Sequence, residues 1–345
     1  MKKLISLILC ILILIPFAVL PFSTSAVGVS LSQGKDALIE QWEKGEAYGF
    51  DYRAYSPVKD ETDNTKYPLV VILHGKYSGS FEGEQLTGSD FYNWSSSEYQ
   101  SRFQDTQGAF ILMPRTPGGD INTWDITSYH ADLMKLIKDY IAVNADNIDT
   151  SRIYLGGWSL GAAGALAVGS SNPDFFAALI IMAPFYSVSA AQAKAMKNTP
   201  IWLITCTKDT TASYVTFAKP FWNLLKDTTE IPSFCRITTF NKYNYYDSGH
   251  HNVQHAVAND LLNQPSDCGM KTETAKGKSI TTGETESIIT WLSSQRLGEA
   301  KEDAACRCDC HASVGWTKFW WSITCFFYMI FSPGKKICAC GASHW

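Results

Sequence analysis

The sequence has little charge and no strong excess of either sign. Charged residues make up only 18% of its 345 residues, and 29 Lys and Arg against 33 Asp and Glu leave a net charge of −4. Such a balance gives no electrostatic reason to expect a nucleic-acid partner. No internal repeat is evident. Hydrophobic residues make up 46% of the chain, which excludes a mainly disordered protein and suits a large domain with a buried core.

The N-terminus has the pattern of a secretory signal. Lys2 and Lys3 precede an apolar run from Leu4 to Phe22, and the small residues 23–26 follow it. This order of charged, apolar and small residues predicts a signal peptide over residues 1–26 with cleavage after Ala26. The alternative is an uncleaved membrane anchor, but two prolines in the run favour cleavage. We therefore expect a secreted or cell-surface protein.

The rest of the chain alternates between short apolar runs and helix-like stretches. This alternation predicts an α/β fold, with a mostly parallel central sheet and helices on both faces. The predicted strands cover residues 49–55, 69–73, 109–113, 153–157, 178–182, 201–205 and 235–240. The predicted helices cover residues 129–143, 160–170, 216–225, 255–262 and 284–295. We expect a catalytic domain over residues 27–297, a linker over 298–305 and a small tail over 306–345, rich in cysteine and aromatic residues.

The motif Gly157-Trp158-Ser159-Leu160-Gly161 lies between a predicted strand and a predicted helix. A sharp strand-to-helix turn with glycine on either side of a serine is the nucleophile elbow of serine hydrolases. The turn leaves no room for side chains at the two glycine positions and holds the serine hydroxyl above the sheet. The sequence therefore predicts Ser159 as a nucleophile.

A seryl nucleophile needs a base and an acid that orients the base. Asp209 follows the apolar strand over residues 201–205, and a carboxylate just past such a strand lies at the edge where open α/β sheets bind ligands. His250 follows the next predicted strand and is the predicted base, with its neighbour His251 as the alternative. The order serine, acid, histidine is that of the α/β hydrolases.

The oxyanion that forms in acyl transfer needs two backbone donors. The first predicted donor is the N–H of Leu160, directly after the nucleophile and at the start of a helix. The second comes from the loop His74-Gly75-Lys76, which follows the strand over residues 69–73. We predict the N–H of Lys76, with that of Gly75 as the alternative. His74 itself is expected to be structural.

From about Tyr48 to Leu297 the chain resembles the α/β-hydrolase superfamily. Within it, the chain is most similar to phospholipase/carboxylesterases and to secreted esterases related to poly(3-hydroxyalkanoate) depolymerases and feruloyl esterases. The matching segments are residues 68–75, residues 147–154 leading into 157–161, Asp209, and Gly249-His250. Two positions depart from the family pattern: Thr205-Cys206 stand where His-Gly is frequent, and Lys76-Tyr77 replace small residues after His74-Gly75.

The resemblance implies a Ser159-His250-Asp209 triad, an acyl-enzyme and no metal or cofactor for catalysis. We expect a hydrolase for small-molecule or polymer-linked carboxylic esters, with Trp124 and Trp158 as candidate walls of the substrate pocket or, alternatively, as packing residues. A prolyl-oligopeptidase-like peptidase is a second reading, but too little chain precedes Leu69 to hold a propeller. A non-catalytic surface-binding protein on a hydrolase scaffold is a third, and the complete triad argues against it.

The tail over residues 306–345 contains two clusters of soft metal ligands around an aromatic run. Such clusters are candidates for a structural Zn²⁺ site, although their C-x-C spacings are tighter than usual. The alternatives are disulfides, which are expected in an exported protein, and ordinary reactive thiols. The aromatic run over residues 316–331 and the following Lys335 and Lys336 suit contact with a membrane or cell envelope. The candidate metal ligands are Cys306, Cys308, Cys310, His311, Cys338, Cys340 and His344.

Overall fold

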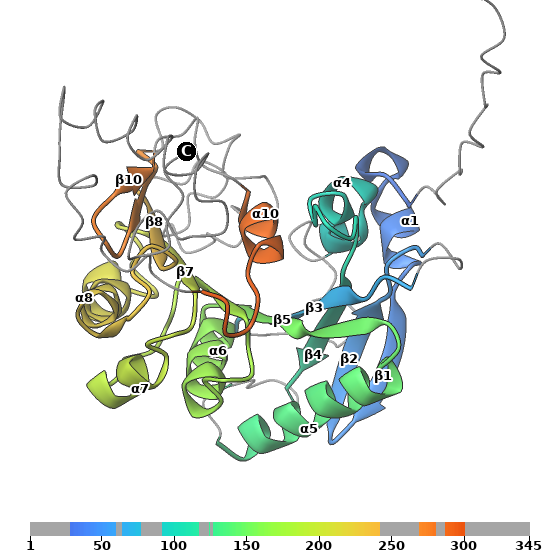
Figure 1. Cartoon of the computed structure of the whole chain (residues 1–345), viewed down its shortest axis with the longest axis horizontal. Helices are drawn as coiled ribbons and strands as arrows, with labels where there is room; N and C mark the ends of the chain where they lie inside the picture. The colour runs from blue at the N-terminus through green and yellow to red at the C-terminus, as the bar shows by residue number, and fades with distance from the viewer. Residues whose placement is uncertain are drawn as a thin grey trace, which may run out of the picture.

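The computed structural model describes residues 28–59, 64–76, 92–116, 124, 127–241, 269–280 and 287–300. Within these ranges ten strands form one sheet in the order β1-β2-β4-β3-β5-β6-β7-β8-β9-β10 (Figure 1). The strands are β1 (Glu43–Ala47), β2 (Phe50–Tyr55), β3 (Tyr67–Leu73), β4 (Phe110–Arg115), β5 (Ile148–Trp158), β6 (Ala178–Met182), β7 (Ile201–Cys206), β8 (Arg236–Phe240), β9 (Lys271–Thr274) and β10 (Ser279–Ile280).

The central part of this sheet is parallel. Strands β4, β3, β5, β6, β7 and β8 pair in parallel with one another, in this order. The pairings of β1 with β2, β2 with β4, β8 with β9 and β9 with β10 are antiparallel. The predicted mostly parallel sheet is therefore confirmed, and the antiparallel strands lie toward its two edges.

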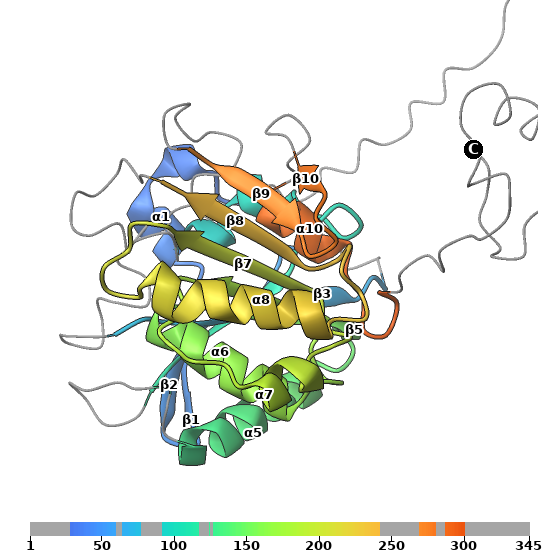
Figure 2. The same cartoon turned by 90° about the vertical axis from the view of Figure 1, so that its left-hand side faces the viewer.

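Helices cover both faces of the sheet, as the alternating pattern predicts. Helices α5 (Thr127–Val143), α6 (Leu160–Ser171), α7 (Ala190–Ala195) and α8 (Lys219–Thr228) lie on one face, and α1 (Lys35–Ile39), α4 (Ser97–Gln100) and α10 (Ile288–Ser293) lie on the other (Figures 1 and 2). Short 3₁₀ turns η1 (Leu31–Gln33) and η2 (Asn93–Ser95) precede α1 and α4, and a π-helical turn, η3 (Tyr214–Ala218), leads into α8. None of the helices in the described ranges has the length and apolarity needed to span a membrane.

The side chains of β3 show how the two layers of helices share the core. Leu69, Val71 and Leu73 belong to one buried cluster, together with residues of α5 and α6. Val70 and Ile72 belong to a second cluster, together with residues of α4 and α10. Successive side chains of a strand point to opposite faces, so a strand covered on both faces must be apolar throughout. All seven residues of β3 are buried accordingly.

All seven predicted strands are present, with boundaries that differ by a few residues. The predicted helices over residues 129–143 and 160–170 match α5 and α6 closely. The helix predicted over 216–225 starts two residues earlier, in the π-helical turn η3. The last predicted helix is shorter, because α10 covers only Ile288–Ser293. The helix predicted over 255–262, the signal peptide and the tail lie outside the described residues.

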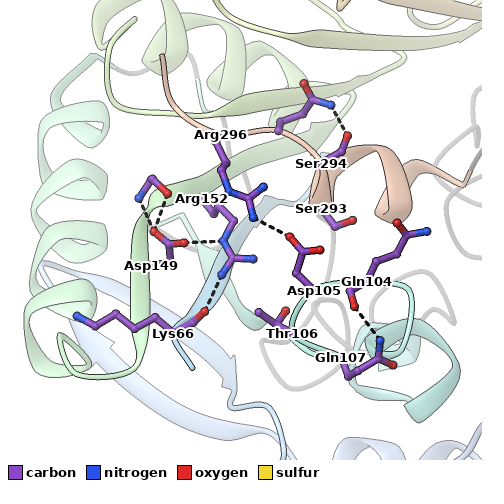
Figure 3. A network of polar contacts seen from close by, with 12 residues as sticks. Lys66, Gln104, Asp105, Thr106, Gln107, Asp149, Arg152, Ser293, Ser294 and Arg296 are labelled. Carbon is purple, nitrogen blue, oxygen red and sulfur yellow. Dashed lines mark hydrogen bonds and ion pairs between the residues drawn. The ribbon is translucent and has the colours of Figure 1, made fainter. Parts of the chain in front are cut away.

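An ion pair fixes the entry into β5 at the amino edge of the sheet. The Nε of Arg152 donates to Oδ2 of Asp149 at 2.6 Å, and its Nη2 donates to the carbonyl oxygen of Lys66 at 2.6 Å (Figure 3). The main-chain and hydroxyl groups of Ser151 also donate to Asp149, at 2.9 and 2.7 Å. Burial acts to raise the pKa of Asp149, but these hydrogen bonds outweigh it and lower the pKa.

We predict that the substitution Asp149→Ala destabilises the protein by about 2 kcal/mol, because it leaves the buried Arg152 guanidinium without its anionic partner. The measurement is the free energy of unfolding in urea. The matched control is Asp132→Ala, which breaks the i,i+3 pair with Lys135 on the surface of α5 and should change stability by less than about 0.5 kcal/mol. Equal effects of the two substitutions would contradict the structural role of Asp149.

Candidate active site

Ser159 lies in the turn between β5 and α6, and its backbone is strained. Its φ of 56° and ψ of −116° lie outside the regions that non-glycine residues favour. The main-chain N–H of Ser159 donates to the carbonyl oxygen of Met182 at 2.9 Å, and its own carbonyl accepts from the N–H of Ala163 at 3.1 Å. Ser159 is 4% exposed. The surrounding structure thus holds the serine in one conformation at the carboxyl edge of the sheet.

The two glycines of the motif are required by close backbone contacts. A Cβ on Gly157 would lie 2.2 Å from the carbonyl oxygen of Gly161, and a Cβ on Gly161 would lie 2.1 Å from the carbonyl oxygen of Leu73. Real Cβ atoms do not approach backbone oxygens so closely. The strand-to-helix turn predicted from the sequence is therefore present, with the first turn of α6 against the end of β3.

Asp209 lies three residues after the end of β7, at the same edge of the sheet as Ser159. It is 5% exposed. Its Oδ1 accepts hydrogen bonds from the main-chain N–H groups of Thr211 at 2.8 Å and Ala212 at 2.9 Å. Two main-chain donors fix the orientation of the carboxylate, as a residue that must orient a histidine requires.

The segment 242–268 carries the predicted base, and the described residues on either side of it lie near the loop that carries Asp209. The N–H of Thr207 donates to the carbonyl oxygen of Phe240, the last residue of β8, at 2.7 Å. A Cβ on Gly269 would lie 2.4 Å from the side-chain amide of Asn241, so the residues on either side of the segment 242–268 are in contact. His250 and its alternative His251 belong to that segment and lie outside the described residues. Their assignment stays a prediction.

The predicted oxyanion donors come from neighbouring parts of the same edge. Leu160 is the first residue of α6, where the helix N-terminus provides partial positive charge. The loop His74-Gly75-Lys76 follows β3, and a Cβ on Gly75 would lie 2.2 Å from the Trp158 ring. Lys76 is exposed, whereas Gly75 is buried. The structure brings both predicted donors to Ser159's edge of the sheet; which of Gly75 and Lys76 donates stays a prediction.

His74 is buried beneath this loop and bound by main-chain groups. Its Nδ1 lies 2.6 Å from the carbonyl oxygen of Gly75, and its Nε2 accepts from the N–H of Thr116 at 3.3 Å. Burial lowers the pKa of His74 to about 4; the guanidinium of Arg115 acts in the same direction, and the hydrogen bond to Gly75 acts to raise the pKa. His74 is therefore neutral at physiological pH, which agrees with its predicted structural role.

The two tryptophans proposed for the substrate pocket differ in burial. Trp124 is 0% exposed, and its indole Nε1 donates to the carbonyl oxygen of His74 at 2.9 Å. A side chain with no exposed surface supports the loop from inside, so the structure favours the packing alternative for Trp124. Trp158 is only partly buried and contacts Gly75, so a role at the pocket stays open to it.

An aromatic pair beside Ser159 is absent from the candidates chosen from the sequence. The main-chain N–H of Phe185 donates to the carbonyl oxygen of Ser159 at 3.3 Å, while the side chain is 43% exposed. The ring centroids of Phe185 and Phe217 lie 4.9 Å apart. The available signal was position: Phe185 follows strand β6, at the edge that binds ligands in such sheets.

The described cysteines do not form a disulfide or a metal site. Cys206 and Cys235 are buried and are not joined by a disulfide. No group of three or more histidine, cysteine, aspartate or glutamate side chains suited to a metal occurs in the described part of the chain. The predicted zinc ligands of the tail lie outside it, so zinc binding there stays a prediction.

A mostly parallel sheet covered on both faces, with a strained serine between a strand and a helix, defines an α/β-hydrolase fold. The fold is shared with a thermostable esterase of known structure, with a TM-score of 0.57 and 20% sequence identity over 75% of this chain and 64% of that chain. A family model described as PET hydrolase-like matches residues 133–258. This stretch contains Ser159, Asp209 and His250.

A poly(3-hydroxybutyrate) depolymerase from Ralstonia pickettii is 29% identical over 134 residues, which are 35% of this chain. The chain covers only 26% of the depolymerase's length. Together the comparisons confirm the resemblance to α/β-hydrolase esterases that the sequence motifs indicate.

We predict that Gly161→Ala destabilises the protein by more than about 2 kcal/mol, because the added methyl group must displace the backbone of β3. The measurement is the midpoint of unfolding in urea. Gly156→Ala is the matched control: its Cβ would meet Ile180 at 3.4 Å, a contact that needs little adjustment. If Gly161→Ala were no less stable than Gly156→Ala, the tight turn described above would be wrong.

His74 should also make stability depend on pH. In the unfolded chain its pKa returns to about 6.5, whereas in the folded protein it is about 4. The unfolded state therefore binds the proton more readily between these values, and stability is lost as pH falls from about 6.5 to about 4, by roughly 3 kcal/mol for this group. The measurement is the melting temperature across this range. The fall in melting temperature between pH 6.5 and pH 4 should be smaller in His74→Gln than in the wild type. Parallel curves of melting temperature against pH for the two proteins would contradict the lowered pKa of His74.

Proposed function

We propose that the protein is a secreted carboxylic ester hydrolase that acts through a Ser159-His250-Asp209 triad and an acyl-enzyme. The observation that carries the proposal is the strained turn that holds Ser159 at the carboxyl edge of the sheet, with the buried carboxylate of Asp209 at the same edge. The family model and the relative, described as PET hydrolase-like and as a poly(3-hydroxybutyrate) depolymerase, support ester hydrolysis.

The proposed reaction has two steps. His250 takes the proton of the Ser159 hydroxyl, whose oxygen attacks the ester carbonyl, and the main-chain N–H groups of Leu160 and Lys76 stabilise the resulting oxyanion. His250 then protonates the departing alcohol. In the second step a water molecule, deprotonated by His250, attacks the acyl-enzyme. The bond between the acyl carbon and the Ser159 oxygen then breaks, His250 returns its proton to that oxygen, and the acid is released. Asp209 keeps His250 in the required tautomer throughout.

We propose an ester with an apolar acyl or alcohol part, either small or linked to a polymer, as the substrate. The exposed side chain of Phe185 supports this, because it adds apolar surface next to the main chain of Ser159, and the partly buried ring of Phe217 packs against it. An extracellular location, proposed from the predicted signal peptide over residues 1–26, suits a polymeric substrate that cannot enter a cell.

We expect Ser159→Ala to lower kcat on p-nitrophenyl acetate and p-nitrophenyl octanoate by at least about 10³-fold, because the nucleophile is removed while the fold is kept. The control is Ser170→Ala near the C-terminal end of α6; the Ser170 hydroxyl donates to the carbonyl oxygen of Ala167, and this variant should keep wild-type kcat. Equal rates for wild type and Ser159→Ala would overturn the proposal.

The variants His250→Ala and His251→Ala decide which histidine is the base. Only the substitution of the true base should lower kcat about as much as Ser159→Ala does.

A further inference from the structure

Both ring nitrogens of His74 bind main-chain groups, from two different parts of the sheet edge. The N–H of Thr116, directly after β4, can only donate, so Nε2 of His74 must be an unprotonated acceptor. The proton therefore lies on Nδ1, which donates to the carbonyl oxygen of Gly75 at 2.6 Å. Only the neutral ring with its proton on Nδ1 makes both hydrogen bonds.

The main chain of His74 is also in contact with buried neighbours, on two sides. The indole of Trp124 donates to the carbonyl oxygen of His74 at 2.9 Å, and the two ring centroids lie 5.2 Å apart. Trp124 is fully buried and stacks on Phe50 of β2, with centroids 6.0 Å apart. From the other side, the first turn of α6 lies against the carbonyl oxygens of Leu73 and His74, because a Cβ on Gly161 would come within 2.5 Å of both.

These contacts surround the short segment that carries the proposed oxyanion donors. Fixing the carbonyl of Gly75 fixes the peptide plane between Gly75 and Lys76, and the N–H of that plane belongs to Lys76. An oxyanion donor contributes to catalysis only when it is held in place before the reaction. The imidazole of His74 contacts the carbonyl oxygen of that peptide plane.

We propose that His74 is a positioning residue, whose neutral imidazole links Thr116 to Gly75 and so aims the Lys76 N–H at the oxyanion. The inference rests on the proposed function. Protonation of Nε2 would break the bond from Thr116 and place a charge next to Arg115, at the end of β4. The charged group that acts on this ring from the described part of the chain is Arg115, and it opposes protonation.

The first test compares steady-state kinetics of three variants on p-nitrophenyl acetate. His74→Phe removes both hydrogen bonds but keeps a planar ring, and we expect kcat to fall at least tenfold with KM changed less than threefold. His74→Asn keeps a donor near the position of Nδ1, and its kcat should be at least threefold higher than that of His74→Phe. The control His130→Gln alters a histidine that also contacts Trp124, at its carbonyl oxygen, and should stay within twofold of wild type.

The second test is made on the wild-type protein and needs a folded variant, His74→Asn, only to assign the signal. The ring ¹⁵N shifts of the seven histidines report tautomer and charge in the wild-type protein, and the missing signal in a His74 variant gives the assignment. We expect His74 to keep its proton on Nδ1 and to remain neutral from pH 8 to pH 5. Titration of this ring near pH 6.5, or a proton on Nε2, would overturn the inference.

The outcomes separate this inference from the proposed function. An active wild type with His74→Phe at wild-type kcat would overturn only the role of His74. A tenfold loss of kcat/KM in His74→Phe that comes from a higher KM at constant kcat would also overturn the role of His74, because the substitution would then have weakened ground-state binding. A wild type that hydrolyses no ester would overturn the proposed function, and with it the role of His74.

Discussion

The backbone turn at Ser159 is the constraint on which the rest of the site depends. A non-glycine residue at φ 56° and ψ −116° costs free energy and persists only where its surroundings enforce it. The hydrogen bond to Met182 on β6 and the approach of α6 to Leu73 on β3 provide that enforcement. The turn thus depends on strands on both sides of β5, which explains why it lies in the middle of the parallel sheet.

The same packing connects Ser159, the proposed nucleophile, to the proposed oxyanion loop. Gly161 brings the first turn of α6 against Leu73 and His74, so the start of the helix and the end of β3 cannot move independently. The buried side chains of His74 and Trp124 then hold that loop from within. The turn at Ser159 and the loop His74-Gly75-Lys76 are thus held by backbone contacts and by hydrogen bonds from neutral side chains.

The sequence was sufficient for the parts of the fold in which burial dominates. The strands β3, β4, β6 and β7 are almost entirely apolar because both of their faces are covered, and that pattern is visible without a structure. The sequence does not indicate the edge strand β1, because Glu43–Ala47 is largely exposed and lacks an apolar pattern. The sequence also does not indicate β9, whose four residues are all polar, or β10, which has only two residues. None of these three strands carries an apolar pattern of its own.

At the site, sequence order and spacing placed Ser159 and Asp209 at the correct edge, because chemistry follows strand ends in this architecture. Sequence order does not predict that Trp124 is buried or that Phe185 is exposed. Both are aromatic residues near strand ends, and only tertiary packing decides which one faces inward. The tautomer of His74 likewise depends on Thr116, a residue 42 positions away in the chain.

The central claim is that Ser159 is a nucleophile, and the most direct measurement is covalent labelling by a fluorophosphonate, followed by intact mass and peptide mapping of the full chain. The account predicts one adduct per molecule, located on Ser159, and its loss when the protein is unfolded before labelling. Failure of the folded protein to react, or an adduct on another residue, would contradict it.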